Sequence, residues 1–139
     1  IGKVIDDGIL SEILTYPFVK YVDHVTKDKL INYYRDSDVF VLPSITETFG
    51  LVYAEAMSQG LPVIYTKGQG FDGQFEEGTV GYHVDAKDPR DIAEKIKMVL
   101  NNYEQLSNNC LSSVGKFDWR RIAKQYESIY KDVLEQAAD

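Results

Sequence analysis

Cysteine is nearly absent from this sequence, with Cys110 standing alone among 139 residues. A single cysteine cannot form an internal disulfide, and no Cys/His cluster has the spacing of zinc ligands. Basic residues are also in deficit, since 15 Lys and Arg face 22 Asp and Glu, which gives a formal net charge of −7. We therefore expect a reducing compartment, no metal ion and no nucleic acid partner.

Long hydrophobic runs are missing as well. No apolar stretch approaches the roughly 20 residues that a membrane-spanning helix needs. The N-terminus lacks the basic and then apolar pattern of a signal peptide. The sequence therefore predicts a soluble, cytoplasmic protein without evident membrane contact, and its length is that of one domain.

Short apolar runs alternate with helical patterns along the chain, which is typical of an α/β protein. The run VFVL, residues 39–42, is continuously apolar, as a strand covered on both faces should be. Asp88 followed by Pro89 is a strong signal for the start of a helix. We expect strands at residues 18–22, 39–42, 61–65 and 81–84, an edge strand at 3–5, and helices at 26–36, 50–59, 88–100 and 119–134.

The segment ETFGLVYAE, residues 47–55, follows the strand VFVL through a polar loop and opens a helix. Free backbone N–H groups at a helix start suit a pyrophosphate, and Gly50 removes the side chain that would block its approach. Glu47 and Glu55 are eight residues apart. In a continuous helix that separation is about 12 Å. The paired carboxylates of a glycosidase lie about 5 to 9.5 Å apart, so this spacing is too long for a paired-carboxylate hydrolase. We interpret Glu47 as a ligand for sugar hydroxyls and Glu55 as a ligand for a ribose diol.

Each of these candidates also has a purely structural interpretation. Two glutamates at this spacing occur by chance on many exposed helices, so the spacing alone leaves the choice open. His83 lies in an expected strand, where a structural role is favoured. The glycines Gly68, Gly70 and Gly73 either approach phosphate groups or form plain turns.

The stretch DVFVLPSITETFGLVYAEAMSQGLPVI resembles the C-terminal domain of the family 4, or group 1, glycosyltransferases of GT-B fold. The family's pattern is an apolar strand, Pro-Ser, Glu, any seven residues, Glu, Ala-Met, a pair ending in Gly, and Pro-Val, and every element is present. The flanking stretches FVKYVDHVTKDKLINYYRDSD and KGQGFDGQFEEGTVGYHVDAKDPRDIAEKI resemble the neighbouring parts of that domain, as FDWRRIAKQYESIY resembles its closing helix. The resemblance implies a Rossmann-like, mostly parallel sheet flanked by helices.

The same resemblance implies transfer of a hexose from a nucleotide diphosphate sugar, with retention of configuration and without a metal or other cofactor. The donor would carry UDP, GDP or ADP. By motif position, Glu55 would bind the ribose and Glu47 would be the catalytic residue. The implied contacts with the donor sugar and phosphate fall on Glu47, Thr48, Phe49, Gly50 and Leu51.

The turn formed by Asp23, His24 and Val25 matches the family's loop that lines the base pocket. The family often has glycine where Asp23 stands, which weakens this part of the resemblance. Polysaccharide biosynthesis, and a parent enzyme located at the cytoplasmic face of the membrane, are further implications.

Two features of the family have no counterpart in these residues: the Arg and Lys that clamp the diphosphate, and the N-terminal domain that binds the acceptor. Lys3 does not replace the clamp. We therefore expect residues 1–139 to be a partial donor-binding domain, lacking its first strand-helix unit and inactive as a transferase by itself. Two alternatives remain open. One is a nucleotide-binding module without catalysis, and the other is a flavodoxin-like regulatory domain, in which Asp6, Asp7 and Lys67 would imitate a receiver site poorly.

Overall fold

The computed structural model describes residues 1–136, and its contacts divide the chain into two compact units, Ile1–Tyr33 and Tyr34–Asp139. The first unit contains helix α1 (Asp7–Ile13). Its N-cap is Asp6, whose carboxylate accepts hydrogen bonds from the backbone N–H groups of Gly8 and Ile9 at 2.8 and 3.0 Å. Asp6 is therefore a capping residue, which does not fit the receiver site of the flavodoxin-like alternative.

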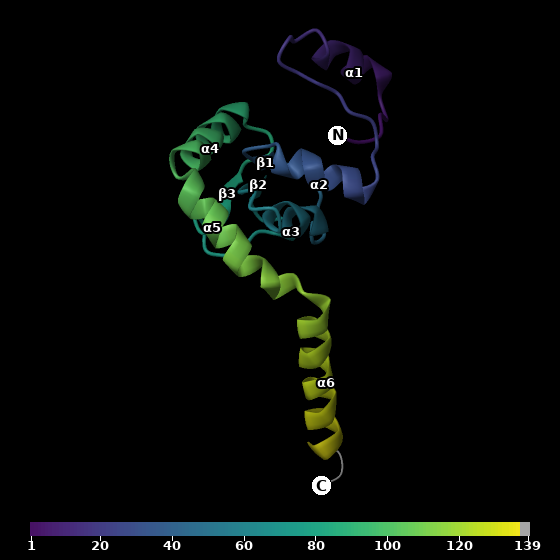
Figure 1. The fold of residues 1–139 in the computed structure, drawn as a ribbon, viewed down its shortest axis with the longest axis vertical. Helices are drawn as coiled ribbons and strands as arrows, with labels where there is room; N and C mark the ends of the chain where they lie inside the picture. Colours follow the sequence, from purple (N-terminus) through teal and green to yellow (C-terminus); the bar gives the residue numbers. More distant parts are fainter. Residues whose placement is uncertain (137–139) are drawn as a thin grey trace. The chain divides into compact units, whose positions relative to one another are not determined.

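The second unit is built on a sheet of three parallel strands within the part of the chain that the structure describes (Figure 1). The strands lie in the order β1 (Phe40–Val41), β2 (Val63–Thr66) and β3 (Gly81–Val84). Every residue of β2 is buried, as expected for the central strand of a sheet covered on both faces. The parallel pairing confirms the α/β class.

Helices cover the two faces of this sheet (Figure 1). On one face, Ile64 of β2 packs in a buried cluster with Val99 and Leu106. Tyr65 is the next residue along the strand, so its side chain points to the opposite face. There its ring lies 6.3 Å from that of Tyr53. Helix α3 (Leu51–Met57) contacts β2, α4 (Pro89–Asn101) contacts β2 and β3, and α5 (Tyr103–Ser113) packs against α3 and α4. The chain also contains α2 (Lys27–Arg35), the 3₁₀ helix η1 (Val114–Phe117) and α6 (Trp119–Gln136).

Most of the expected elements are present. The strands expected at 39–42, 61–65 and 81–84 correspond to β1, β2 and β3, and the four expected helices correspond to α2, α3, α4 and α6. Asp88 caps α4 as predicted, accepting from Arg90 N–H at 2.9 Å and Asp91 N–H at 3.4 Å. Helices α1 and α5 were not expected.

The predicted strands at residues 3–5 and 18–22 are wrong, because neither of these described segments forms a strand. Gly2, just before the first segment, donates its N–H to Val22 O at 3.0 Å, and among the described residues no ladder of backbone bonds continues from it along residues 3–5. A strand needs a continuous ladder with a neighbour. Pro17 directly precedes the second segment, and the turn closed by Val19 N–H and Tyr16 O runs into it.

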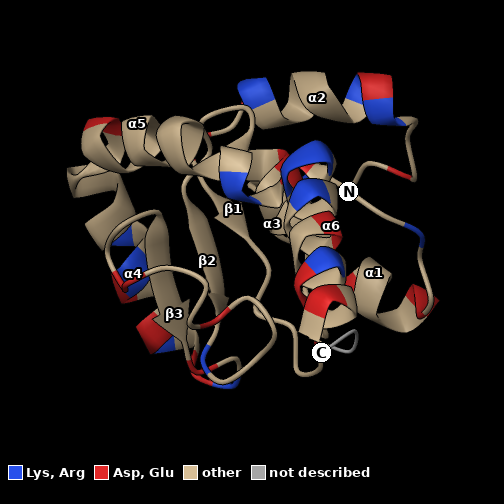
Figure 2. Ribbon diagram, turned by 90° about the horizontal axis from the view of Figure 1, so that it is seen from below, with Lys and Arg blue, Asp and Glu red and all other residues tan. Residues whose placement is uncertain are grey.

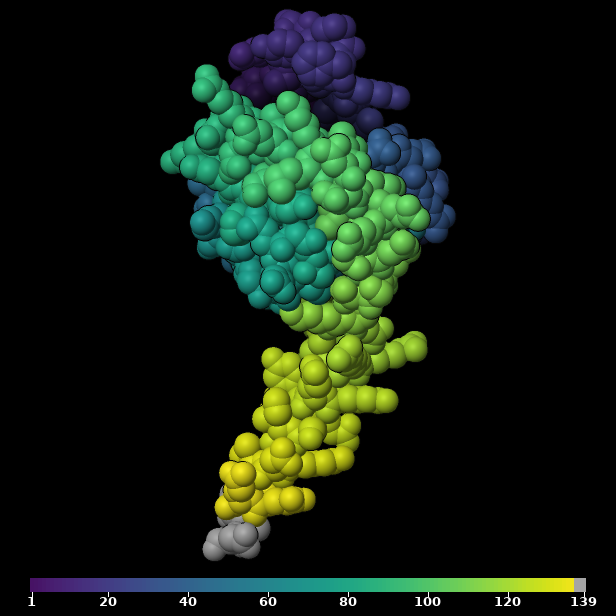
Figure 3. All heavy atoms as spheres, turned by 90° about the vertical axis from the view of Figure 1, so that its left-hand side faces the viewer, coloured from purple at the N-terminus to yellow at the C-terminus, as the bar shows by residue number. Residues whose placement is uncertain are grey.

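Helix α6 carries the apolar stripe that its sequence predicts, yet none of its described residues is buried. Acidic and basic residues are interspersed along the ribbon of α6 (Figure 2). Figure 3 shows the atoms of this helix as spheres, in yellow-green to yellow. Trp119 is 69% exposed and Leu134 is 70% exposed. No described helix is both long enough and apolar enough to span a bilayer.

Candidate functional site

Two loops leave the sheet side by side, one after β1 and one after β2. Because β1 and β2 are parallel neighbours, their carboxyl ends lie at the same edge of the sheet, which is where ligands bind in proteins of this class. Thr66 Oγ1, at the end of β2, donates to Ser44 O in the first loop at 2.8 Å. Two further hydrogen bonds join the loops themselves: Glu47 N–H donates to Gln69 Oε1 at 2.9 Å, and Gly70 N–H donates to Glu47 O at 3.0 Å. The backbone of Glu47 is therefore held from both its N–H and its carbonyl by the loop after β2.

Close packing between these loops depends on glycine. A Cβ atom added to Gly70 would lie 1.8 Å from the carbonyl oxygen of Thr48. Gly50, which precedes α3, has φ +74°, and a Cβ there would lie 2.4 Å from the ring of Tyr53. Larger residues at either position would displace the segment that contains Glu47.

Tyr53 fixes the start of α3 against the end of β1. Its hydroxyl donates a hydrogen bond to Leu42 O at 2.6 Å, and its ring is 1% exposed. Burial raises the pKa of Tyr53 to about 12, and the nearby charge of Glu47 contributes to the rise. The Tyr53 hydroxyl is therefore a fixed, neutral donor that ties helix to strand.

The side chains of the predicted sugar and phosphate segment are accessible. Glu47 is half-buried, and its Oε1 accepts a hydrogen bond from Phe49 N–H at 3.3 Å. Thr48 is exposed, Leu51 is 51% exposed, and Phe49 is 37% exposed with its ring 5.7 Å from that of Phe117. The segment is thus backed by the β2 loop and keeps side chains open to a ligand.

Glu55 lies on α3, half-buried and close to Tyr34 at the end of α2. Burial raises the pKa of Tyr34, and the negative charge of Glu55 raises it further. Because helix α3 begins only at Leu51, Glu47 lies in the preceding loop and the helical rise of 1.5 Å per residue does not apply to the whole span. The structure places both glutamates in the same unit, one before the helix and one within it.

The predicted base-binding residues belong to the other unit, Ile1–Tyr33. Asp23 Oδ1 accepts hydrogen bonds from His24 N–H at 2.6 Å and from the Tyr21 hydroxyl at 3.1 Å. The carboxylate of Asp23 therefore shapes the turn in which it lies. Val25 is half-buried, and the assignment of this turn to a nucleotide base stays a prediction.

Gln69 and Asp72 were missed by sequence analysis, which singled out the glycines around them. Gln69 holds the N–H of Glu47, and Asp72 accepts from Gly68 N–H at 2.7 Å. The available signal was the position of this loop directly after a predicted strand. Among residues 1–136, no group of three or more His, Cys, Asp or Glu is placed to hold a metal ion.

The chain matches the family described as "Glycosyl transferases group 1" over residues 15–112, a span that includes both Glu47 and Glu55. It belongs to this family.

A D-inositol 3-phosphate glycosyltransferase from Corynebacterium kroppenstedtii is 29% identical over 121 residues, which are 85% of this chain and 27% of that protein. Sucrose-phosphate synthase from Thermosynechococcus elongatus has a similar structure, with a TM-score of 0.78 and 30% identity over 96% of this chain and 34% of that one. The Anabaena protein HepE, in complex with UDP and glucose, shares the fold with a TM-score of 0.78 and 20% identity, over 94% of this chain and 39% of its own. These 139 residues therefore span about a quarter to two fifths of the length of these three proteins.

The family and the parallel sheet agree with the resemblance to part of a GT-B glycosyltransferase. The match also sets aside the flavodoxin-like alternative, since it covers 98 of the 139 residues (112 − 15 + 1 = 98).

Proposed function

We propose that residues 1–139 bind the nucleotide diphosphate sugar donor of a retaining hexosyltransferase. The observation that carries the proposal is the pair of loops at the carboxyl ends of β1 and β2, which hydrogen bonds join at Glu47 inside the matched stretch. The structural neighbour HepE has been solved with UDP and with UDP-glucose, which supports a nucleotide sugar as the ligand class.

Each group at the site has a proposed role. Glu47 contacts the donor sugar as the catalytic residue, with Thr48 beside it. The backbone amides of Phe49, Gly50 and Leu51 contact the sugar and phosphate oxygens, because the first N–H groups of a helix have no partner within it. Among the described residues no side chain caps α3, whose N-cap is Gly50. The Phe49 N–H donates to Glu47 Oε1 at 3.3 Å, and the donor would take the place of this contact.

The remaining predicted residues bind the nucleoside half of the donor. Glu55 accepts both hydroxyl hydrogens of the ribose, a strong arrangement because the acceptor is charged. Asp23, His24 and Val25 line the base pocket. UDP, GDP and ADP all remain candidates for the nucleotide, and no metal or other cofactor takes part.

Transfer to the acceptor, with retention, is proposed for a protein that supplies the rest of the family's length, including an acceptor-binding domain. Polysaccharide biosynthesis in the cytoplasm, with the enzyme at the inner membrane face, is the proposed setting. Residues 1–139 alone should release no nucleoside diphosphate from UDP-, GDP- or ADP-linked sugars, and measurable turnover by this polypeptide would contradict that expectation.

Calorimetric titration of the chain with UDP, GDP and ADP tests donor binding. We expect one of the three to bind, and Glu55→Ala to weaken it by about tenfold or more, since a hydrogen bond to a charged group contributes about 1.5 to 3 kcal/mol. Glu94→Ala is the matched control, because Glu94 is an exposed glutamate on α4.

The outcomes are distinct. If Glu55→Ala binds the nucleotide as tightly as the unchanged chain, the ribose assignment is wrong. If none of the three nucleotides binds, donor recognition by these residues is wrong.

A further inference from the structure

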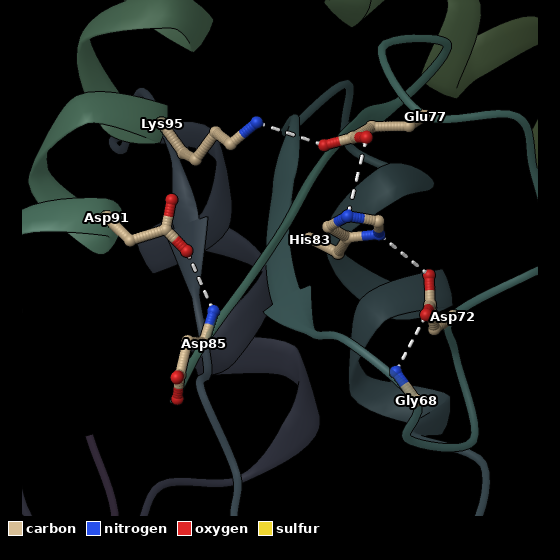
Figure 4. Close-up of polar contacts among 7 residues, drawn as sticks. All are labelled: Gly68, Asp72, Glu77, His83, Asp85, Asp91 and Lys95. Carbon is tan, nitrogen blue, oxygen red and sulfur yellow. Dashed lines mark hydrogen bonds and ion pairs between the residues drawn. The ribbon is translucent and has the colours of Figure 1, made fainter. Parts of the chain in front are cut away.

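His83 on β3 lies between two carboxylates that belong to the loop after β2 (Figure 4). Its Nδ1 is 3.1 Å from Asp72 Oδ1, and its Nε2 is 3.4 Å from Glu77 Oε2. The second oxygen of Glu77 is 3.1 Å from the ammonium group of Lys95 on α4. Strand β3 and helix α4 thus hold the loop at two points.

Asp72 closes a turn within that loop. One of its oxygens faces His83, while the other accepts from Gly68 N–H at 2.7 Å (Figure 4). Asp72 N–H in turn donates to Gln69 O at 2.8 Å. The carboxylate therefore joins the start of the turn to strand β3.

The turn encloses Gln69, Gly70 and Phe71, and the first two of these hold Glu47. Gln69 Oε1 accepts from Glu47 N–H, and Gly70 N–H donates to Glu47 O. A continuous path of hydrogen bonds thus runs from His83 through Asp72 and the turn to the backbone of Glu47.

The apolar side of the same turn is anchored separately. Phe71 is 2% exposed, and its ring lies 4.6 Å from that of Tyr53 and 5.0 Å from that of Tyr65. Apolar contacts hold the turn to the core but are not directional. The direction in which Gln69 and Gly70 present their polar atoms depends on the polar contacts of Asp72.

A carboxylate that is ionised can only accept hydrogen bonds, so the His83 nitrogen facing Asp72 carries a proton. Partial burial works to raise the pKa of Asp72, but the Gly68 N–H, the His83 ring and the Gly73 N–H together lower it by more, and the net pKa is below its usual value. Asp72 is therefore charged near neutral pH, and its bonds are of the stronger, charge-assisted kind.

We propose that His83 and Asp72 are positioning residues, which orient the turn of residues 68–72 so that Gln69 and Gly70 hold Glu47 in place for the donor. This inference rests on the proposed role of Glu47 in donor binding. His83 and Asp72 act through the turn and do not touch the donor.

Amide hydrogen exchange, measured by NMR on the 139-residue chain, tests the proposal without any ligand. We compare the unchanged chain with His83→Leu, which removes both ring nitrogens, and with His83→Asn, which keeps an N–H donor near the position of Nδ1. The amides to follow are those of Gly68, Gly70 and Glu47, and those of β2 report on the core.

Asp91→Asn is the matched control. Asp91 accepts from Asp85 N–H at 2.8 Å, a carboxylate–backbone bond of the same kind at the end of β3 (Figure 4). That bond joins the loop after β3 to α4 and is not on the path to Glu47.

In His83→Leu we expect exchange at Gly68, Gly70 and Glu47 to become about tenfold faster, the size expected for loss of a hydrogen bond to a charged group. The amides of β2 should be unchanged, and His83→Asn should recover most of the protection. Asp91→Asn should speed amide exchange at Asp85 alone. A role limited to stability would instead raise exchange across the whole unit, with no rescue by asparagine.

The proposal is overturned if Gly70 and Glu47 keep their exchange rates in His83→Leu, or if His83→Asn exchanges as fast as His83→Leu. Should His83→Leu fail to fold, Asp72→Asn, which keeps the shape of the side chain, makes the same comparison. Calorimetry with the nucleotide then separates the two proposals. Absence of binding by the unchanged chain contradicts donor recognition, while exchange still decides the role of His83.

Discussion

Replacing Gly70 by alanine would place a methyl group against the backbone of the segment that contains Glu47. The added Cβ would lie 1.8 Å from Thr48 O, 2.2 Å from Thr48 C and 2.7 Å from Phe49 N, all of them backbone atoms that no side-chain rotation can move. Gly70 would also have to keep its N–H bonded to Glu47 O at 3.0 Å. The methyl group and this hydrogen bond cannot both be accommodated without movement of the loop.

The required movement follows from the distances. Ordinary van der Waals contact of a Cβ begins at 3.4 Å, so the Thr48 carbonyl must move by 3.4 − 1.8 = 1.6 Å. Overpacking of this kind typically costs about 1 to 3 kcal/mol of stability. A displacement of about 1 Å at a binding group can cost on the order of 10²-fold in activity. We therefore expect Gly70→Ala to weaken nucleotide binding by at least about tenfold while the chain still folds.

The assay combines urea unfolding with calorimetric titration of whichever nucleotide binds the unchanged chain. Two glycines serve as controls. A Cβ at Gly115 meets nothing within 4 Å, so Gly115→Ala should change neither the free energy of unfolding nor the nucleotide affinity. A Cβ at Gly73 also meets nothing, but its φ of +80° strains an alanine, so Gly73→Ala should lose about 1 to 2 kcal/mol of stability without a clash at Thr48.

Normal nucleotide affinity in a folded Gly70→Ala chain would refute the reasoning, because the contact between the two loops would then not set the position of the Glu47 segment. The same conclusion would follow if Gly73→Ala reduced affinity as much as Gly70→Ala did.

Three further predictions concern other parts of the chain. Cys110 is fully buried, and burial raises the pKa of its thiol to about 12, so a thiol reagent should label it only after unfolding in guanidinium; rapid labelling of the native chain would contradict this. The lowered pKa of Asp72 means that its charge stabilises the fold above the usual carboxyl pKa of 3.8, and that this contribution is lost as the pH falls through the lowered value. The unfolding free energies of the unchanged chain and of Asp72→Asn should thus differ at neutral pH and converge in acid. A difference in unfolding free energy that does not change with pH would contradict the stabilising role of the Asp72 charge. Ile129 on α6 is 54% exposed, so Ile129→Gln should alter thermal stability by less than about 0.5 kcal/mol, and a larger loss would show that α6 is packed.

The sequence allowed prediction of those elements whose signals are local. The run VFVL is recognised by its consecutive apolar side chains, which are half-buried in the structure, and the pair Asp88-Pro89 by helix capping. Neither signal needs knowledge of distant residues. Glu47, Gly50 and Glu55 could likewise be singled out, because they share one continuous motif. These features locate the sheet edge at which the site lies.

Features that depend on distant partners could not be predicted. Residues 18–22 have the apolar composition of a strand, but a strand also requires a neighbour to pair with, and the ladder is missing. Helix α5 is interrupted by polar residues and buries only Leu106 and Cys110, so its periodicity is weak. The bond from Glu47 to Gln69 spans 22 positions and arises only because β1 and β2 are adjacent.

NMR mapping of nucleotide binding tests the central claim most directly. Titrating the chain with UDP, GDP and ADP should shift the backbone amides of Phe49, Gly50 and Leu51 for the nucleotide that binds, and a spectrum of Glu55→Ala should show those shifts only at higher concentrations. Amide shifts confined to other regions, or no shifts with any of the three nucleotides, would contradict donor recognition by the Glu47–Glu55 segment.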